Sequence, residues 1–310
     1  MRLAFATPRR GSRRALATTL LLTVAVNASG AQSSPADSAL LRGDLSRAES
    51  LYYAATRARP RDPVAREALA RYVAARGASR VAAVLFEEAR LFGGDATRIG
   101  RELAPLYEEL GDWRAVLTLP ASPLDAGERR RAAWLSEHRS STRVDSTPTA
   151  IAGMPQGDTL GRVAVHLGGR SAMAILVARD EGITIGSRLA SGIHRFGPDS
   201  SHAVADSITV GNVRLFNVPL EIGGPPATVT IGLKAISSLL PTLDYGTGRI
   251  AFNRSSAILS ALRLPILRRD GRIWVLEQGW IDLADFAALR AKLKSAITVD
   301  LPAGVLRVQP

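Results

Sequence analysis

The 310-residue sequence contains no cysteine. This absence excludes disulfide bonds, thiolate metal sites and a cysteine nucleophile. Lysine is nearly absent as well, because Lys234, Lys292 and Lys294 are the only three, and the remaining basic residues are arginines. These arginines are scattered along the chain rather than clustered with aromatic residues, which argues against a nucleic-acid-binding surface.

Long hydrophobic runs are missing after the N-terminal segment, so we expect no integral membrane segment once that segment is removed. The segment itself resembles an export signal. A basic stretch from Arg9 to Arg14 precedes an apolar run from Ala15 to Val26, which is too short to span a bilayer well, and small residues Ser29 to Ala31 follow. We expect residues 1–31 to be a signal peptide of an exported protein, periplasmic or extracellular, with Sec and twin-arginine export both open.

The overall composition indicates a globular protein, with 46% hydrophobic and 22% charged residues. The formal net charge of +12 includes five arginines in residues 1–31, so the rest of the chain carries +7. A solvated basic surface is the simplest interpretation of that charge.

A 34-residue period runs through residues 35–120, marked by Gly43, Gly77 and Gly111. Other positions recur at the same spacing, namely Ala48 with Ala82, Tyr52 with Phe86, and Ala55 with Ala89. This pattern resembles about two and a half tetratricopeptide (TPR) repeats, each a pair of helices with glycine at the turn. The resemblance implies a surface that binds an extended peptide or a partner domain, and an unrelated array of helical hairpins is the alternative.

The next segment, residues 121–158, is predicted to hold one more helix over 126–138 and then a polar linker over 140–149. After it the hydrophobic period changes from 3.6 to 2. Apolar residues alternate from Val163 to Leu167 and again from Ile183 to Ile185, and glycine pairs separate the runs. This alternation predicts short β-strands joined by hairpins, in an all-β barrel.

Several motifs in residues 159–254 follow the order found in retropepsin-like aspartic proteases, the retroviral type. They are a first hairpin over 163–170, a loop over 175–187, a middle hairpin over 204–220, an apolar-Gly segment over 230–233 and a closing hairpin over 243–250. The resemblance implies that each chain supplies one aspartate within an Asp-Thr/Ser-Gly loop. A homodimer then completes a pair of carboxylates that share one proton.

The expected nucleophile is missing from that loop. In the gap-free register Ala178 stands in the aspartate position, and an alanine can neither hold nor donate a proton. A shift by two residues would place Asp180 there, with Glu181 beside it adding a like charge. Asp180 is therefore a candidate catalytic residue only in the shifted register, and otherwise an acid that caps its own turn.

Other chemistry has little support in the sequence. The four histidines (His138, His166, His194 and His202) are dispersed without metal-ligand spacing, so no metal site and no cofactor are predicted. Residues 255–310 are predicted to form a small α/β extension or a remnant second lobe, with a helix over 283–296. Within them, 298–306 repeats the pattern of 242–250, and Asp300 falls 56 residues after Asp244.

The sequence thus predicts TPR-like helices over 35–120, a helix and linker over 121–158, a retropepsin-like barrel over 159–254 and a small α/β extension over 255–310. The expected function is an exported scaffold that binds a polypeptide or protein partner with a protease-like domain that has lost its activity. The alternative is a periplasmic aspartic endopeptidase that uses Asp180 in a homodimer.

Overall fold

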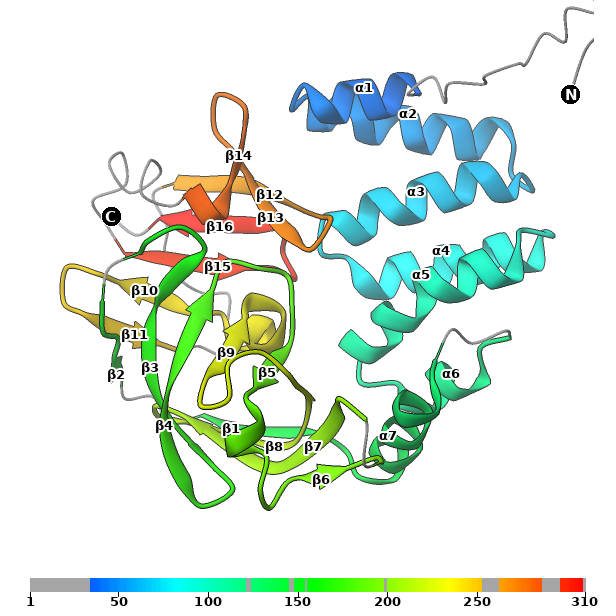
Figure 1. Cartoon of the computed structure of the whole chain (residues 1–310). Helices are drawn as coiled ribbons and strands as arrows, with labels where there is room; N and C mark the ends of the chain where they lie inside the picture. The colour runs from blue at the N-terminus through cyan, green and yellow to red at the C-terminus, as the bar shows by residue number, and fades with distance from the viewer. Residues whose placement is uncertain are drawn as a thin grey trace, which may run out of the picture. The chain divides into compact units, whose positions relative to one another are not determined.

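The structure is a computed structural model that describes residues 34–120, 124–144, 148–153, 155–197, 200–252, 262–285 and 296–308. Helices come first along the chain and strands follow, in the order that the sequence predicts (Figure 1). The predicted signal peptide lies outside the described residues. Within them, no helix combines the length and the apolar character needed to cross a membrane.

Seven α-helices lie in the described part of the chain. They are α1 (Pro35–Leu41), α2 (Leu45–Ala58), α3 (Pro63–Ala75), α4 (Ser79–Leu91), α5 (Ala96–Glu109), α6 (Trp113–Thr118) and α7 (Ala126–Glu137). Most begin at an aspartate whose carboxylate accepts a backbone N–H of the first turn, as Asp62 does before α3 and Asp125 before α7. Such a cap stabilises a helix by about 1 kcal/mol, so these aspartates fix where the helices start.

The three glycines of the 34-residue period each close the turn after a helix. Gly43, Gly77 and Gly111 follow α1, α3 and α5, with φ of 80°, 86° and 68°. Glycine is favoured there because a side chain strains the left-handed region. The aligned alanines and aromatics other than Ala55 are buried between the helices, with Phe86 and Ala82 almost fully enclosed.

A first sheet of eight strands contains a closed ring. Its order is β1-β8-β5-β9-β4-β3-β7-β6, and an additional pairing of β7 with β8 closes six of the strands on themselves. The strands are β1 (Ser141–Val144), β3 (Thr159–Leu167), β4 (Arg170–Val177), β5 (Ile183–Ile185), β6 (His194–Arg195), β7 (His202–Val210), β8 (Val213–Ile222) and β9 (Val229–Gly232). Short 3₁₀ helices, η1 (Ser187–Leu189) and η2 (Leu233–Leu239), follow β5 and β9.

A second sheet of eight strands has the order β14-β13-β12-β16-β15-β10-β11-β2. Its strands are β2 (Thr149–Ala150), β10 (Thr242–Asp244), β11 (Arg249–Ala251), β12 (Leu262–Arg269), β13 (Arg272–Leu276), β14 (Trp280–Asp282), β15 (Ile297–Asp300) and β16 (Val305–Val308). The 3₁₀ helix η3 (Leu283–Asp285) follows β14. The two segments that repeat each other in sequence lie side by side, since Thr242 of β10 pairs with Thr298 of β15.

The expected fold class, a retropepsin-like barrel followed by a small α/β extension, is wrong. The closing hairpin β10–β11 belongs to the second sheet, where it pairs with β15 and β2. Residues 262–308 contribute five strands to that sheet, and Ile266 and Leu306 join the same apolar core as Leu176 of the ring. An extension cannot be peripheral when its side chains complete the central core.

Two local expectations are affected as well. Residues 141–144 and 149–150, predicted as linker, form β1 against β8 and β2 against β11. Of the helix predicted over 283–296, only η3 is described as helical, and 286–295 lie outside the described residues. These two polar segments show little alternation of apolar residues, so the sequence pattern does not predict them as strands.

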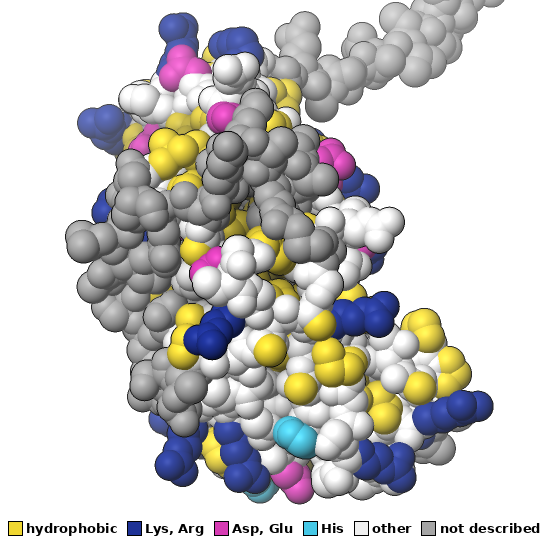
Figure 2. Space-filling view, turned by 90° about the vertical axis from the view of Figure 1, so that its left-hand side faces the viewer, with side chains coloured by type: hydrophobic (Ala, Val, Ile, Leu, Met, Phe, Trp, Pro, Cys, Tyr) yellow, Lys and Arg dark blue, Asp and Glu magenta, His cyan; other side chains and the backbone are white. Residues whose placement is uncertain are grey.

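Figure 2 shows the face of the molecule on the side of β10, β11 and β2. On the described part of this face, Lys and Arg side chains are spread out and separated by hydrophobic and uncharged ones. The acidic side chains are fewer and also apart from one another. The basic character of the chain is therefore distributed over this face rather than gathered in one patch.

Candidate functional site

The loop that the sequence analysis singled out, residues 178–182, lies between β4 and β5 and is fixed by its backbone. The N–H of Ala178 donates to Asp158 O at 2.7 Å, and the N–H of Asp180 donates to Gly271 O at 3.0 Å. The Arg179 carbonyl accepts the N–H of Leu233 at 2.9 Å. The loop is thus packed onto the turn between β12 and β13, a contact with the C-terminal sheet.

Ala178 is 1% exposed and belongs to the apolar core. Asp180 is 15% exposed, and its Oδ2 accepts a hydrogen bond from Arg268 Nε at 2.9 Å. The same guanidinium binds both carboxylate oxygens of Glu109, at 2.9 and 2.7 Å, so Arg268 joins the end of α5, β12 and the loop. The Oδ1 atom of Asp180 is buried and has no hydrogen-bond partner among the described residues.

The electrostatics of this ion-pair group follow from burial and proximity. Burial raises the pKa of Glu109, but the hydrogen bonds and charge of Arg268 outweigh it and hold that pKa below its ordinary value. Conversely, burial lowers the pKa of Arg268, and the two carboxylates outweigh it and raise the pKa overall. Glu109 and Arg268 are therefore both charged at neutral pH.

This arrangement bears on the shifted register, in which two Asp180 side chains would share a proton. The carboxylate is committed to Arg268, and the residue does not belong to the lining of either cavity described below. Pairing with a second copy would require breaking an ion pair that is about nine-tenths buried on the arginine side. The endopeptidase alternative stays a prediction, and it requires that the ion pair of Asp180 with Arg268 be broken.

A cavity of about 460 Å³ opens where α5–α7 approach the ring strands. Its apolar lining comes mainly from the ring, with Ile183 and Phe216 among it, and Trp113 of α6 faces it from the helices. Charged side chains line it as well: Glu108 and Glu109 of α5, Arg131 of α7, Glu221 of β8 and Lys234 of η2. Serine and threonine hydroxyls from residues 140–142 and 237–238 add neutral hydrogen-bonding groups.

This junction cavity lies over a gap in the pairing of β8. On one edge, β1 pairs with residues 213–216 of β8 and β5 pairs with residues 221 and 222. Of the four residues between, 218–220 pair only with β7 among the described strands, and Asn217, with φ of 51°, interrupts that pairing. Pro219 falls in this stretch, where a missing N–H is best tolerated because the edge is uncovered.

Glu108 is the described carboxyl in the cavity lining whose pKa is raised. Burial raises the pKa of Glu108 above its ordinary value, and Arg131 and Lys234 only partly offset that effect. The Glu108 carboxylate lies 3.9 Å from the Arg131 guanidinium, so the two form only a loose pair. The cavity therefore offers an apolar surface and also a carboxyl group whose charged form a closer cation would stabilise.

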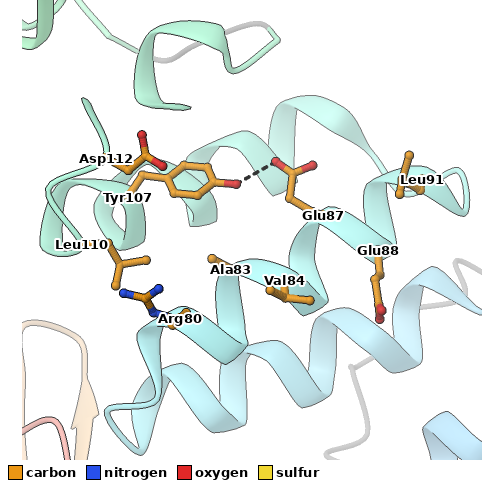
Figure 3. A pocket seen from close by; sticks show the side chains of 9 residues that line it. All are labelled: Arg80, Ala83, Val84, Glu87, Glu88, Leu91, Tyr107, Leu110 and Asp112. Atoms are coloured by element: carbon orange, nitrogen blue, oxygen red, sulfur yellow. Dashed lines mark hydrogen bonds between the residues drawn. The ribbon is translucent and has the colours of Figure 1, made fainter. Parts of the chain in front are cut away.

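A second cavity, also about 460 Å³, lies on the helices alone (Figure 3). It is lined by residues of α4 together with the end of α5 and the start of α6. Tyr107 projects across it, and its hydroxyl donates to Glu87 at 3.0 Å. Helix α6 has only six residues and ends before Pro120, so α4 keeps exposed apolar side chains such as Val84 and Leu91.

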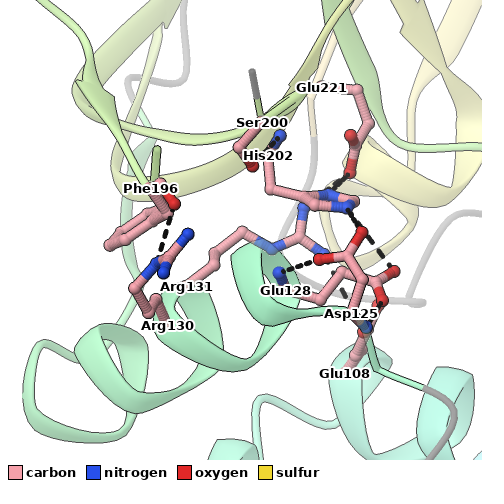
Figure 4. Close-up of polar contacts among 9 residues, drawn as sticks. All are labelled: Glu108, Asp125, Glu128, Arg130, Arg131, Phe196, Ser200, His202 and Glu221. Carbon is pink, nitrogen blue, oxygen red and sulfur yellow. Dashed lines mark hydrogen bonds and ion pairs between the residues drawn. The ribbon is translucent and has the colours of Figure 1, made fainter. Parts of the chain in front are cut away.

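A cluster of polar side chains joins α7 to the ring beside the junction cavity (Figure 4). His202 at the start of β7 is 9% exposed, with Nδ1 at 2.8 Å from Glu221 Oε1 and Nε2 at 3.2 Å from Asp125 Oδ2. Glu128 Oε1 lies 3.7 Å from the same Nε2, and Arg131 binds Glu221 at 2.6 Å. Asp125, Glu128 and His202 are the described residues whose side chains could together hold a metal ion.

The sequence analysis identified the 178–182 loop but missed both the cavity and this cluster. His202 and Asp125 are 77 residues apart, which no local spacing rule detects. One signal was available: the capping pair Asp125 and Glu128 marks the start of a helix with two carboxylates on one side. Which strand faces that helix end is a property of the tertiary fold.

Comparison with known proteins adds no family assignment. No protein-family model matches this chain, and no curated protein matches it either. The resemblance of the helices to TPR repeats stays a prediction, and what the molecule does has to be argued from its own geometry.

Proposed function

We propose that this protein is an exported scaffold that binds an extended polypeptide in the junction cavity and does not cleave it. The observation that carries the proposal is the cavity itself, about 460 Å³ with an apolar floor and a charged and hydroxyl-bearing rim. Pockets of a few hundred Å³ with this composition are typical of ligand sites in proteins. Helix pairs of the TPR type, which the 34-residue period favours, recruit polypeptides in the same way.

The gap in the pairing of β8 supports a polypeptide rather than a small compact ligand. Phe216, Pro219 and Leu220 of β8 line the cavity at this gap. An uncovered strand edge presents unpaired backbone groups, so an extended polypeptide can bind there by adding a strand. Glu108, which has only the loose pair with Arg131, favours a ligand with a basic residue among the apolar ones.

The absence of cleavage is the second part of the proposal. Ala178 has no acid–base chemistry, and the Asp180 carboxylate is held by Arg268 away from the cavity lining. A resemblance to an enzyme is not a reason to expect activity when the reacting group is replaced or occupied. The described side chains therefore support binding of a polypeptide without its hydrolysis.

The test is a random-peptide selection with the purified protein, followed by affinity measurement for the best peptides by fluorescence anisotropy. Ser238 is exposed at the cavity, so Ser238→Trp should obstruct it without disturbing the core. We expect that variant to weaken binding at least about tenfold, or about 1.4 kcal/mol. Ser50→Trp, at an exposed serine of α2, is the matched control and should bind as the native protein does.

The same peptides are incubated with the native protein and with Asp180→Ala between pH 4 and pH 8, and the products are examined by mass spectrometry. Intact peptides in both cases are the expected result. Fragments produced by the native protein alone would replace the proposal with the endopeptidase alternative. Equal peptide affinity for the native protein and Ser238→Trp would remove the junction cavity as the binding site.

A further inference from the structure

The cluster at the start of α7 contains the donor set of a metal site, and it goes beyond the proposed function without resting on it. Asp125 Oδ2, Glu128 Oε1 and His202 Nε2 lie within 4.8 Å of one another and come from two segments far apart in sequence. We propose that these three residues bind a divalent transition-metal ion of the Zn²⁺ class, which ties the start of α7 to β7. Imidazole nitrogen and carboxylate oxygen are both ordinary ligands of such ions.

The histidine is oriented from outside the cluster. Nδ1 of His202 lies 2.8 Å from Glu221 Oε1, and this contact suits the tautomer with its proton on Nδ1, because an ionised carboxylate only accepts hydrogen bonds. Arg131, itself buried, holds Glu221 in place at 2.6 Å. The Nε2 atom is thereby directed at Asp125 and Glu128. A carboxylate behind a metal-binding histidine fixes the ring and raises its basicity, and this is the usual arrangement at metal sites.

The spacing of the donor atoms also fits an ion. With bonds of about 2.0–2.1 Å, neighbouring ligands of a tetrahedral Zn²⁺ are about 3.4 Å apart. The separations from His202 Nε2 are 3.2 Å to Asp125 and 3.7 Å to Glu128, on either side of that value. Each carboxylate keeps its other oxygen on the backbone, because Asp125 Oδ1 accepts the N–H of Glu128 and Glu128 Oε2 accepts the N–H of Asp125. The helix cap therefore holds both ligands in position.

The charge count points the same way. Three carboxylates face His202, those of Asp125, Glu128 and Glu221, and Arg131 pairs with one of them. A divalent ion would balance the other two.

The experiment uses the native protein purified without a histidine tag, stripped with a chelator and titrated with Zn²⁺ by calorimetry. We expect one Zn²⁺ per chain and a higher melting temperature, since a ligand that binds only the folded state stabilises it. Asp125→Asn keeps an N-cap side chain but loses the charge, and it should weaken Zn²⁺ binding at least tenfold. His202→Asn should abolish the binding.

Asp95→Asn is the matched control, because Asp95 caps α5 in the same manner and lies outside the cluster. It should bind Zn²⁺ as the native protein does. If His202→Asn fails to fold by circular dichroism, Asp125→Asn and X-ray absorption of the Zn²⁺ complex, showing one imidazole and oxygen ligands, decide the matter. The proposal is overturned if the native protein takes up no stoichiometric Zn²⁺, or if Asp125→Asn binds it with unchanged affinity.

Discussion

The helices contact the strands along two regions of unlike construction. In the first, which we call the backbone seam, the turns after α1 and α3 pack directly on the second sheet. Trp280 Nε1 donates to Leu40 O at 2.8 Å, Arg76 donates to Ile266 O, and the Gly77 backbone touches that of Leu301. In the second, the ionic seam, charged side chains of α5 and α7 reach across to β12, β8 and β7.

The difference between the seams explains where the cavity lies. Where two backbones meet directly, as at Gly77 and Leu301, no room remains for a ligand. Arginine and glutamate side chains are long, so the elements that they join can stand farther apart, and space remains between them. The junction cavity lies along the ionic seam, with Glu109, Arg131 and Glu221 in its lining. A site for a ligand is therefore built where the contact is made by side chains.

The strongest way to break the ionic seam is Arg268→Met. It leaves Glu109 and Asp180, each 15% exposed, without their cation. Removing one partner of a buried ion pair costs about 3–5 kcal/mol, and we expect a loss of about 4 kcal/mol in the free energy of unfolding at pH 7. Urea denaturation measures it. A loss below about 1 kcal/mol would mean that water, and not Arg268, satisfies the two carboxylates.

Arg268→Met should also change how the free energy of unfolding depends on pH. The folded-state pKa of Glu109 lies below its ordinary value of 4.5, so its stabilising contribution is complete above about pH 4.5 and is lost as pH falls through the folded value. In Arg268→Met the largest causes that lower the pKa of Glu109 are gone, and burial, which raises that pKa, is opposed only by the Ser79 hydrogen bond and the charge of Lys234. We expect the difference in unfolding free energy between native protein and variant to shrink steadily from pH 6 to pH 3.

The backbone seam is tested by Gly77→Ala. A Cβ at this position would overlap the carbonyl oxygen of Leu301, and φ of 86° disfavours any side chain. We expect a loss of about 3 kcal/mol, from overpacking against the backbone and from left-handed strain together. Gly93→Ala is the control, since φ is 89° and nothing lies within 4 Å of the added carbon.

Gly93→Ala should cost only the strain, about 1–2 kcal/mol. The contrast between the two variants, measured by thermal or urea unfolding, isolates the contact with the second sheet. Equal losses for Gly77→Ala and Gly93→Ala would show that the backbone seam opens at little cost. That result would remove the distinction between the two seams.

Local features of the fold could be predicted from the sequence, and pairings between distant segments could not. The spacing of Gly43, Gly77 and Gly111 places three helix turns, because positive φ and glycine are directly coupled. Alternation of apolar residues over 163–167 places β3. The pairing of β10 with β15, by contrast, joins Thr242 to Thr298, which are 56 residues apart along the chain. From the order of its motifs, the sequence predicts a barrel that ends at residue 254. The second sheet instead contains strands from both sides of that position.

The candidate site also combines features that the sequence predicts with contacts that only the fold creates. The absence of an ionisable side chain at Ala178 can be read from the sequence, because it concerns one residue. The binding of Asp180 by Arg268 was not, since the two are 88 residues apart and the pairing depends on how β12 lies against the loop. His202 looked isolated for the same reason. Its carboxylate neighbours come from a helix cap and from β8, which only the fold brings together.

The smallest effect is expected for Trp280→Phe, which removes one hydrogen bond from the backbone seam and keeps most of the aromatic surface. The lost N–H donor leaves Leu40 O, at the end of α1, to be solvated instead, and we expect a cost of about 1 kcal/mol. Since neither group titrates, this cost should be the same at pH 4 and pH 7, unlike that of Arg268→Met. Hydrogen exchange should show the loss as faster exchange in α1 and α2 alone. Faster exchange that extended to α5 and α7 would mean that the two seams open together, and the comparison between them would then describe geometry but not stability.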